Sequence, residues 1–173
     1  MKGRVIEMKL NLGCGDKKIA GYINVDVCGE PDMLCDLSKF PWPFENDSVE
    51  EVFSSHFMEH VIDYEKTVLE IHRILRPGGF MHFKVPHFRS MFYPRHLHKY
   101  AFSSTTCRLL CERRDYQFGG KHLFEEVSMK FNYPYITNTV LKQIFSFCAN
   151  KIQSIWEYIG APIDEIEFVA KKK

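Results

Sequence analysis

Short apolar runs, separated by turn residues, recur along this chain and predict β-strands. Each run is five to seven residues long, and most of them end near Gly, Pro, Asn or Asp, which is the pattern of strands in a compact sheet. In the last run Ile166, Phe168 and Ala170 alternate with polar residues, as in a strand with one buried face. The expected strands are residues 8–12, 22–27, 33–37, 49–55, 80–85, 126–131 and 165–170.

A different period, with apolar residues three or four positions apart, predicts the helices. Over residues 63–75 one helix face carries Tyr64, Val68, Ile71 and Leu75. Asp63 is the expected N-cap, and Pro77-Gly78-Gly79 is expected to stop the helix. Further helices are expected at 104–113 and at 137–158, the second broken near Asn150.

Strands that alternate with helices predict an α/β fold with a doubly wound, mostly parallel, Rossmann-like sheet. In such a sheet, ligands bind beyond the carboxyl ends of the strands, so the loops after the first four strands are where a site is expected. A chain of 173 residues fits one domain, and we expect residues 1–173 to form it.

Composition narrows the class of protein further. The formal net charge of +1 argues against a strongly basic nucleic-acid binder, although a local basic patch and nucleic acid are not excluded. No apolar run is long enough for a membrane span, and the start has no apolar signal-peptide core. The six cysteines form no C-x-x-C pair, so we expect reduced thiols and a cytoplasmic location.

A glycine turn and two carboxylates follow the first three predicted strands. Gly13 and Gly15 stand two apart directly after an apolar strand, where a missing Cβ permits a sharp turn and a close approach to a ligand. Asp26 ends the second strand, where a carboxylate can accept from both hydroxyls of a ribose. Asp36 ends the third strand, where it can accept from an adenine amine. Such residues at three consecutive strand ends favour a nucleoside site.

These stretches resemble the class I S-adenosylmethionine-dependent methyltransferases, and among them the small type 11-like group. About half the chain matches, in the family's order: Leu10-Asn11-Leu12-Gly13-Cys14-Gly15, Gly21-Tyr22-Ile23-Asn24-Val25-Asp26, Cys35-Asp36-Leu37, Pro43-Phe44-Glu45-Asn46-Asp47-Ser48-Val49, Ser55-His56-Phe57-Met58-Glu59-His60 and Arg73-Ile74-Leu75-Arg76-Pro77-Gly78-Gly79.

The resemblance implies the class I methyltransferase fold, with seven strands in the order 3-2-1-4-5-7-6 and an antiparallel seventh strand at 165–170. It implies S-adenosylmethionine as the cofactor. The residues implied to bind it are Asn11, Gly13, Cys14 and Gly15 at the methionine part, Asp26 at the ribose, Asp36 and Leu37 at the adenine, and Ser55 near the methyl end.

The sequence departs from the family pattern in two places. Asn11 stands where an acidic residue is commoner. Gly13 and Asp26 are closer than the ~20 residues of a dinucleotide fingerprint, so the first helix is expected to be a stub at about 17–20 and an NAD enzyme is disfavoured.

His56-Phe57-Met58-Glu59-His60 also matches H-x-x-E-H, an inverted zinc-peptidase motif, but its place after a strand of a cofactor-type sheet disfavours a peptidase. The segment is similar to the E-x-x-E-H segment of small-RNA 2′-O-methyltransferases and ubiquinone-pathway O-methyltransferases. There a divalent cation sits beside the cofactor. By that resemblance Glu59 and His60 match, His56 replaces a carboxylate, and His87 is a possible further ligand. The alternative is that these side chains only hydrogen-bond local loops, and we expect no stoichiometric metal.

The segment 86–100 follows the fifth strand and is the expected substrate loop. Its basic residues are interleaved with aromatic ones and suit an anionic or aromatic acceptor: His87, Arg89, Arg95, His96, His98 and Lys99. The alternative is a solvated loop whose cations balance the charges of Asp and Glu residues elsewhere, and such a loop would have the same composition.

The sequence therefore predicts a methyltransferase that uses S-adenosylmethionine on an unidentified acceptor, with a small molecule favoured. His56 or His87 is the expected base if the acceptor is a hydroxyl, because imidazole titrates near neutrality. Three alternatives stay open: a degenerate binding module without catalysis, a metal-assisted O-methyltransferase, and a metal-dependent hydrolase.

Overall fold

The computed structural model describes residues 8–90, 97–112, 118, 121–134, 136–158 and 163–173. Within them, seven strands form one sheet: β1 (Met8–Leu12), β2 (Ile23–Asp26), β3 (Met33–Leu34), β4 (Val49–Ser55), β5 (Leu75–Pro86), β6 (Phe124–Asn132) and β7 (Glu165–Lys172). The helices are α1 (Tyr64–Ile74), α2 (Ser104–Arg108), the 3₁₀-helix η1 (Leu109–Cys111), α3 (Thr139–Lys151) and α4 (Gln153–Tyr158).

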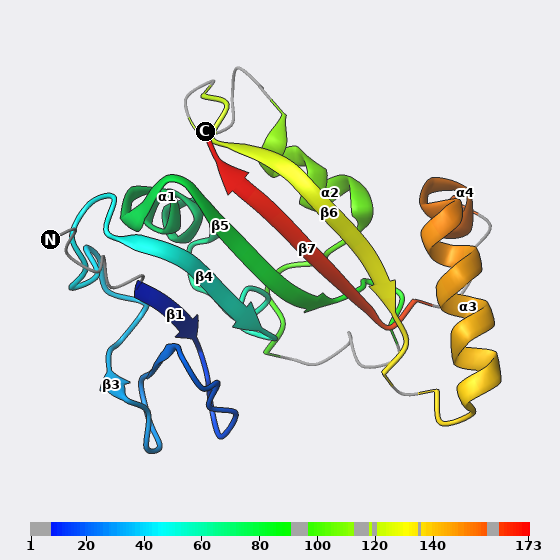
Figure 1. Ribbon diagram of the computed structural model, residues 1–173, viewed down its shortest axis with the longest axis horizontal. Helices are drawn as coiled ribbons and strands as arrows, with labels where there is room; N and C mark the ends of the chain where they lie inside the picture. Colours follow the sequence, from blue (N-terminus) through cyan, green and yellow to red (C-terminus); the bar gives the residue numbers. More distant parts are fainter. Residues whose placement is uncertain (1–7, 91–96, 113–117, 119–120, 135, 159–162) are drawn as a thin grey trace, which may run out of the picture.

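The strand order is β3-β2-β1-β4-β5-β7-β6, which confirms the order implied by the family resemblance (Figure 1). The pairs from β3 to β5 are parallel, while β7 runs antiparallel to both β5 and β6. Pro86 at the end of β5 is paired with Glu165 at the start of β7. The first residue of β7 therefore lies at the edge where the parallel strands end, which is the edge of the candidate site.

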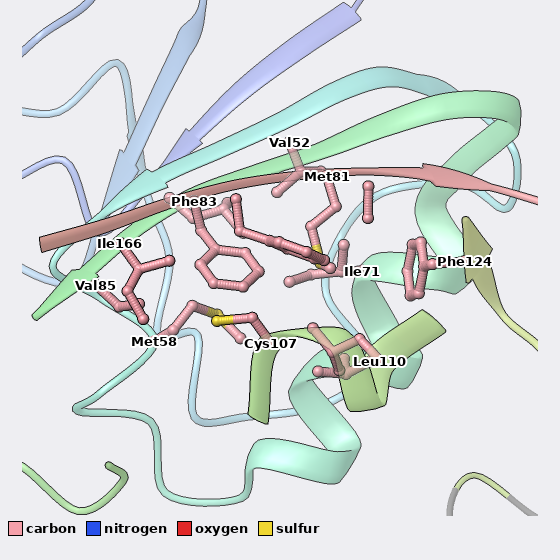
Figure 2. Close-up of a cluster of buried hydrophobic side chains, with 14 of the residues drawn as sticks. Val52, Met58, Ile71, Met81, Phe83, Val85, Cys107, Leu110, Phe124 and Ile166 are labelled. Carbon is pink, nitrogen blue, oxygen red and sulfur yellow. The ribbon is translucent and has the colours of Figure 1, made fainter. Parts of the chain in front are cut away.

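The hydrophobic core lies between one face of the sheet and helices α1 and α2 (Figure 2). Phe83 of β5 is central to it and is packed against Phe168 of β7 and Phe102, with ring centroids 5.3 and 6.3 Å apart. Ile71 of α1 and Cys107 of α2 close the core from the helix side and are almost fully buried. This buried apolar core supports β5 and β7, whose paired ends lie at the edge that carries the site.

The connections from β1 to β2 and from β2 to β3 contain no helix, so the stub expected at 17–20 is a turn. Two buried asparagine side chains explain this difference. The Asn11 amide donates to the Lys17 carbonyl at 3.0 Å, and the Asn24 side chain both accepts from the Ile19 N–H at 2.8 Å and donates to the Ile19 carbonyl at 3.3 Å. These bonds satisfy backbone groups that a helical turn would otherwise pair.

Helix α1 begins as expected, with Asp63 accepting a hydrogen bond from the Lys66 N–H at 3.0 Å. It ends at Ile74, and β5 starts at the next residue, so Pro77-Gly78-Gly79 lies within the strand and not at a helix stop. The helix expected at 104–113 is divided into α2 and η1. The break expected near Asn150 falls at Ile152, between α3 and α4.

Candidate cofactor and acceptor site

A cavity of about 320 Å³ opens at the carboxyl-end edge of the sheet. Loops after β1, β2, β3 and β4 contribute to its lining, as a parallel sheet predicts. Four of the predicted cofactor residues line it: Gly13, Asp26, Asp36 and Leu37. A cavity of this size is large enough to enclose much of a nucleoside.

The glycine turn approaches the cavity without side chains. Gly13 has φ +64°, and a Cβ there would lie 2.5 Å from Cδ2 of Phe57. Its backbone N–H donates to the Val25 carbonyl at 2.9 Å, which joins the turn to β2. Gly15 has φ +49° with open space around its missing Cβ, and its N–H donates to the Asp26 carboxylate at 2.8 Å. Both the backbone conformation and the packing therefore require glycine at position 13, whereas at position 15 only the conformation requires it.

The other four residues predicted to contact the cofactor are not among those that line the cavity: Asn11, Cys14, Gly15 and Ser55. Asn11 is 2% exposed, and its side-chain amide donates to Asn24 at 2.9 Å beneath the turn. Cys14 is also buried, and burial raises the pKa of its thiol. Ser55 is half-buried at the end of β4. The structure therefore gives Asn11 a scaffolding position under the turn.

Two carboxylates face the cavity from neighbouring strand ends. Asp26 accepts from the Gly15 N–H at 2.8 Å through one oxygen and from the Val27 N–H at 2.7 Å through the other. Asp36 accepts from both the hydroxyl and the backbone N–H of Ser38, at 2.6 and 3.0 Å, and these bonds lower its pKa. Oδ2 of Asp26 accepts one of these bonds, and Oδ2 of Asp36 has an ion-pair contact with Lys39 at 3.2 Å, so each Oδ2 keeps a lone pair to which a ligand hydroxyl or amine can donate.

An apolar wall completes the cavity. Leu37 is buried in it, while Val27 and Ile62 at the rim are 62% and 65% exposed. Phe40 also lines the cavity and stacks on Trp42, with ring centroids 5.9 Å apart. Apolar side chains exposed around a polar pair of carboxylates suit a ligand with a flat, partly apolar ring.

His56 lines the cavity, but its two ring nitrogens face carboxylates. Nε2 lies 3.0 Å from Oε2 of Glu165, and Nδ1 lies 3.3 Å from Oε1 of Glu59. Hydrogen bonding to Glu165, and then to Glu59, raises the pKa of His56 to about 9. Burial opposes ionisation of Glu165, but its bonds to His56 and Asn132 prevail and lower its pKa. The ring is thus an imidazolium at neutral pH, and it offers no free nitrogen to act as the predicted base.

His87 lies away from the cavity and is fully buried. Its Nε2 is 2.9 Å from Oε1 of Glu157, and its Nδ1 accepts from the Arg89 N–H at 3.1 Å. Ser104 bonds the same carboxylate through its hydroxyl and its backbone N–H. This network ties the end of β5 to α2 and α4. Its geometry gives His87 a structural position and leaves no nitrogen for the predicted base role.

The described part of the loop 86–100 reaches the cavity wall at its far end. The Lys99 N–H donates to the Glu59 carbonyl at 2.8 Å, and Nδ1 of His60 lies 3.2 Å from the Leu97 carbonyl. Arg89 is directed elsewhere, with Nη1 donating to the Glu157 carbonyl at 2.7 Å. Arg95 and His96 lie outside the described residues.

For two residues of the site, the neighbouring sequence did not indicate that they would lie there. Glu165 reaches His56 from 109 positions away, and only the antiparallel pairing of β7 with β5 brings it to this edge. Phe57 fills the space beside Gly13 and appeared only as a spacer within H-x-x-E-H. The strand order implied by the family resemblance is the one signal that could have located Glu165 in advance.

Residues 10–83 match the family described as a methyltransferase domain. A solved Archaeoglobus fulgidus S-adenosylmethionine-dependent methyltransferase is 18% identical, with a TM-score of 0.60, over 96% of this chain and 86% of that one. Haemonchus contortus phosphoethanolamine N-methyltransferase 2, solved with phosphomonomethylethanolamine and S-adenosylhomocysteine, is 18% identical, with a TM-score of 0.61, over 96% of this chain and 48% of that one.

A Haloferax volcanii protein solved with the Trm112 methyltransferase activator is 16% identical, with a TM-score of 0.60, over 95% of this chain and 82% of that one. At these identities the structural likeness concerns the fold alone. No protein of curated function matches the sequence.

The strand order and the solved structures show the class I methyltransferase fold, and the match of residues 10–83 to the methyltransferase-domain family agrees with the type 11-like resemblance of the motifs. The cofactor that this class and this family indicate is S-adenosylmethionine. Among the described residues, none of the helices is both long and apolar enough to cross a membrane.

Proposed function

We propose that this protein transfers a methyl group from S-adenosylmethionine to a small-molecule acceptor. The observation that carries the proposal is the meeting of Gly13, Asp26 and Asp36 around one cavity. They come from three separate strand ends, and their chemistry matches three parts of one nucleoside ligand. A glycine turn alone, or one carboxylate alone, is common in α/β proteins and would carry much less weight.

In this proposal Asp26 accepts from the ribose hydroxyls, and Asp36 with Leu37 contacts the adenine. The turn from Gly13 to Gly15 passes the methionine part, where an added Cβ would crowd the ligand or Phe57. Asn11 and Cys14 act from beneath the turn, and Ser55 from the end of β4. Hydrogen bonds from the backbone hold the Asp26 carboxylate in place before the cofactor arrives, which lowers the entropic cost of binding.

The methyl end of the cofactor is proposed to lie near His56 and His60, which follow β4, whereas Asp36 follows β3, three strands away in the sheet order. The positive sulfur already activates the methyl group, so the protein's main task is to align the acceptor for in-line attack. Neither His56 nor His87 offers a nitrogen for proton removal in the geometry seen here. An acceptor whose nucleophilic atom needs no base therefore fits this site best.

The loop 86–100 is proposed to select the acceptor. Its far end is bonded to the turn that carries Glu59 and His60, on the methyl side of the cavity. The phosphoethanolamine N-methyltransferase relative is solved with a phosphorylated amine. Phosphorylated metabolites are thus the first acceptors to screen, followed by acidic sugars and aromatic acids.

Titration calorimetry with S-adenosylmethionine tests cofactor binding directly. Asp26→Ala should weaken binding at least about tenfold, because each charge-assisted hydrogen bond contributes about 1.5–3 kcal/mol. Glu30→Ala is the matched control, since it removes the same charge from an exposed position in the next loop and should leave the affinity unchanged. Equal affinities for Asp26→Ala and the wild type would remove the proposed ribose contact.

Catalysis is tested separately from binding. The wild-type protein should convert S-adenosylmethionine to S-adenosylhomocysteine in an acceptor-dependent manner, measured by mass spectrometry across the acceptor screen. Binding without turnover of any acceptor would instead support the degenerate module.

A further inference from the structure

Three potential metal ligands gather beside the cavity: Glu59, His60 and His98. One ligand atom from each lies within 4.8 Å of those of the other two. The imidazole centroids of His60 and His98 are 4.9 Å apart, with ring planes at 76°. Bonds of about 2.0–2.2 Å from zinc to nitrogen or oxygen place two ligand atoms of a tetrahedral ion about 3.4 Å apart, so side-chain shifts of about 1–1.5 Å would close the site.

Glu59 is the most unusual of the three. Its side chain is fully buried, and Oε2 has no hydrogen-bond partner within the described part of the chain. Oε1 lies 3.3 Å from Nδ1 of His56, with which it forms an ion pair, and 3.9 Å from Nε2 of His60. Oε2 has no polar partner of either kind among the described residues. Buried carboxylates are normally hydrogen-bonded, paired or bound to a metal, and Oε2 lacks the first two.

The orientation of His60 suits a metal ligand. Its Nδ1 lies 3.2 Å from the Leu97 carbonyl, which can only accept, so Nδ1 carries the proton and Nε2 carries the lone pair. Nε2 is the nitrogen that faces Glu59. Metal-bound imidazoles usually donate their other N–H to a carbonyl or carboxylate in this way.

The backbone holds the third ligand near the other two. The Lys99 N–H donates to the Glu59 carbonyl at 2.8 Å, which fastens the residue after His98 to the turn after β4. Leu97, the residue before His98, is the one bonded to His60. The two residues that flank His98 are thus hydrogen-bonded to the other two members of the cluster, Leu97 to His60 and Lys99 to Glu59.

We propose that Glu59, His60 and His98 bind one divalent transition-metal ion, with zinc the best fit, on the methyl side of the cavity. One carboxylate and two imidazoles form a ligand set typical of zinc, whereas magnesium and calcium prefer all-oxygen sites. Three protein ligands leave a coordination position for water or an acceptor oxygen. His60 also lines the cavity, so the ion would border it. This revises the expectation of no metal, and His98 takes the place of His87, which is turned towards Glu157.

Titration calorimetry of the metal-stripped protein with Zn²⁺ tests the proposal without reference to enzyme activity. The wild type should bind one ion per chain, and Glu59→Gln and His98→Ala should each lower the affinity by at least about 100-fold. His122→Ala removes an exposed histidine elsewhere and is the matched control, with unchanged affinity expected. Magnesium should not compete.

Cobalt substitution separates this site from the six cysteines. One bound Co²⁺ per chain should show visible d–d absorption without the near-ultraviolet charge transfer of a thiolate ligand. Absence of stoichiometric zinc, retention of zinc in both variants, or thiolate absorption would each overturn the proposal. If Glu59→Gln does not fold, His98→Ala alone decides. Titration of the same samples with S-adenosylmethionine reports cofactor binding independently, so failure of the metal site and failure of the proposed function are distinguishable.

Discussion

Substitution of Gly13 by alanine gives the sharpest prediction for the turn after β1. The added Cβ would lie 2.5 Å from Cδ2 and 2.9 Å from Cβ of Phe57, closer than such atoms approach in folded proteins. The residue must also keep φ +64°. The left-handed conformation costs an alanine about 1–2 kcal/mol, and overpacking costs about 1–3 kcal/mol. Gly13→Ala should therefore lower the free energy of unfolding by about 2–5 kcal/mol.

Gly15→Ala is the internal control for this substitution. Gly15 has φ +49°, but nothing lies within 4 Å of its added Cβ, so only the conformational cost of about 1–2 kcal/mol remains. Urea unfolding followed by circular dichroism measures both variants. In a double-mutant cycle, Phe57→Ala is made both in the wild type and in Gly13→Ala. Gly13→Ala should be less destabilising when Phe57 is alanine, because removal of the ring relieves part of the clash. If Gly13→Ala is no more destabilising than Gly15→Ala, then the close approach of Phe57 does not constrain this turn.

Three further predictions concern other parts of the fold. Arg73→Met should lower the free energy of unfolding by about 3–5 kcal/mol in urea, because it removes two hydrogen bonds to the buried Glu70 and leaves that charge without its cation. Burial alone would raise the pKa of Glu70, but hydrogen bonds from Arg73 and the Trp42 N–H lower it below the ordinary value of 4.5. The ionised Glu70 therefore stabilises the fold fully above pH 4.5, and this stabilisation is lost as the pH falls through the lowered pKa. As the pH is lowered from about 6 to about 3, the urea concentration at the unfolding midpoint should therefore decrease more in the wild type than in Glu70→Gln. Once an acceptor is found, Arg95→Ala should raise its KM several-fold, at about 1 kcal/mol for the lost charge, whereas Arg89→Ala should change it little because that guanidinium donates to the Glu157 carbonyl. Neither change should alter the affinity for S-adenosylmethionine in calorimetry.

The fold was more predictable than the site, for a physical reason. Strand and helix periods are local, so the apolar face of α1 and the Asp63 cap were visible in the sequence. The family resemblance then supplied the strand order. The turn at 17–20 was mispredicted as a helix because its backbone groups are satisfied by Asn11 and Asn24, which no periodicity reveals.

Within the site, the residues at strand ends were predictable and their partners were not. Asp26 ends β2 and Asp36 lies two residues after β3, so their shared edge follows from a parallel sheet. His56 was expected to titrate near neutrality, yet Glu59 and Glu165 raise its pKa. His87 was expected at the cavity, yet Glu157 on α4 holds it in the interior. Both differences depend on contacts distant in sequence, which residue type and spacing do not specify.

A crystal structure with bound S-adenosylhomocysteine tests the central claim most directly, because it locates every part of the cofactor at once. The account predicts ribose hydroxyls within hydrogen-bond distance of the Asp26 carboxylate, the adenine beside Asp36 and Leu37, and the sulfur on the side of His56. A ligand bound outside this cavity, or inside it with the ribose away from Asp26, would contradict the account.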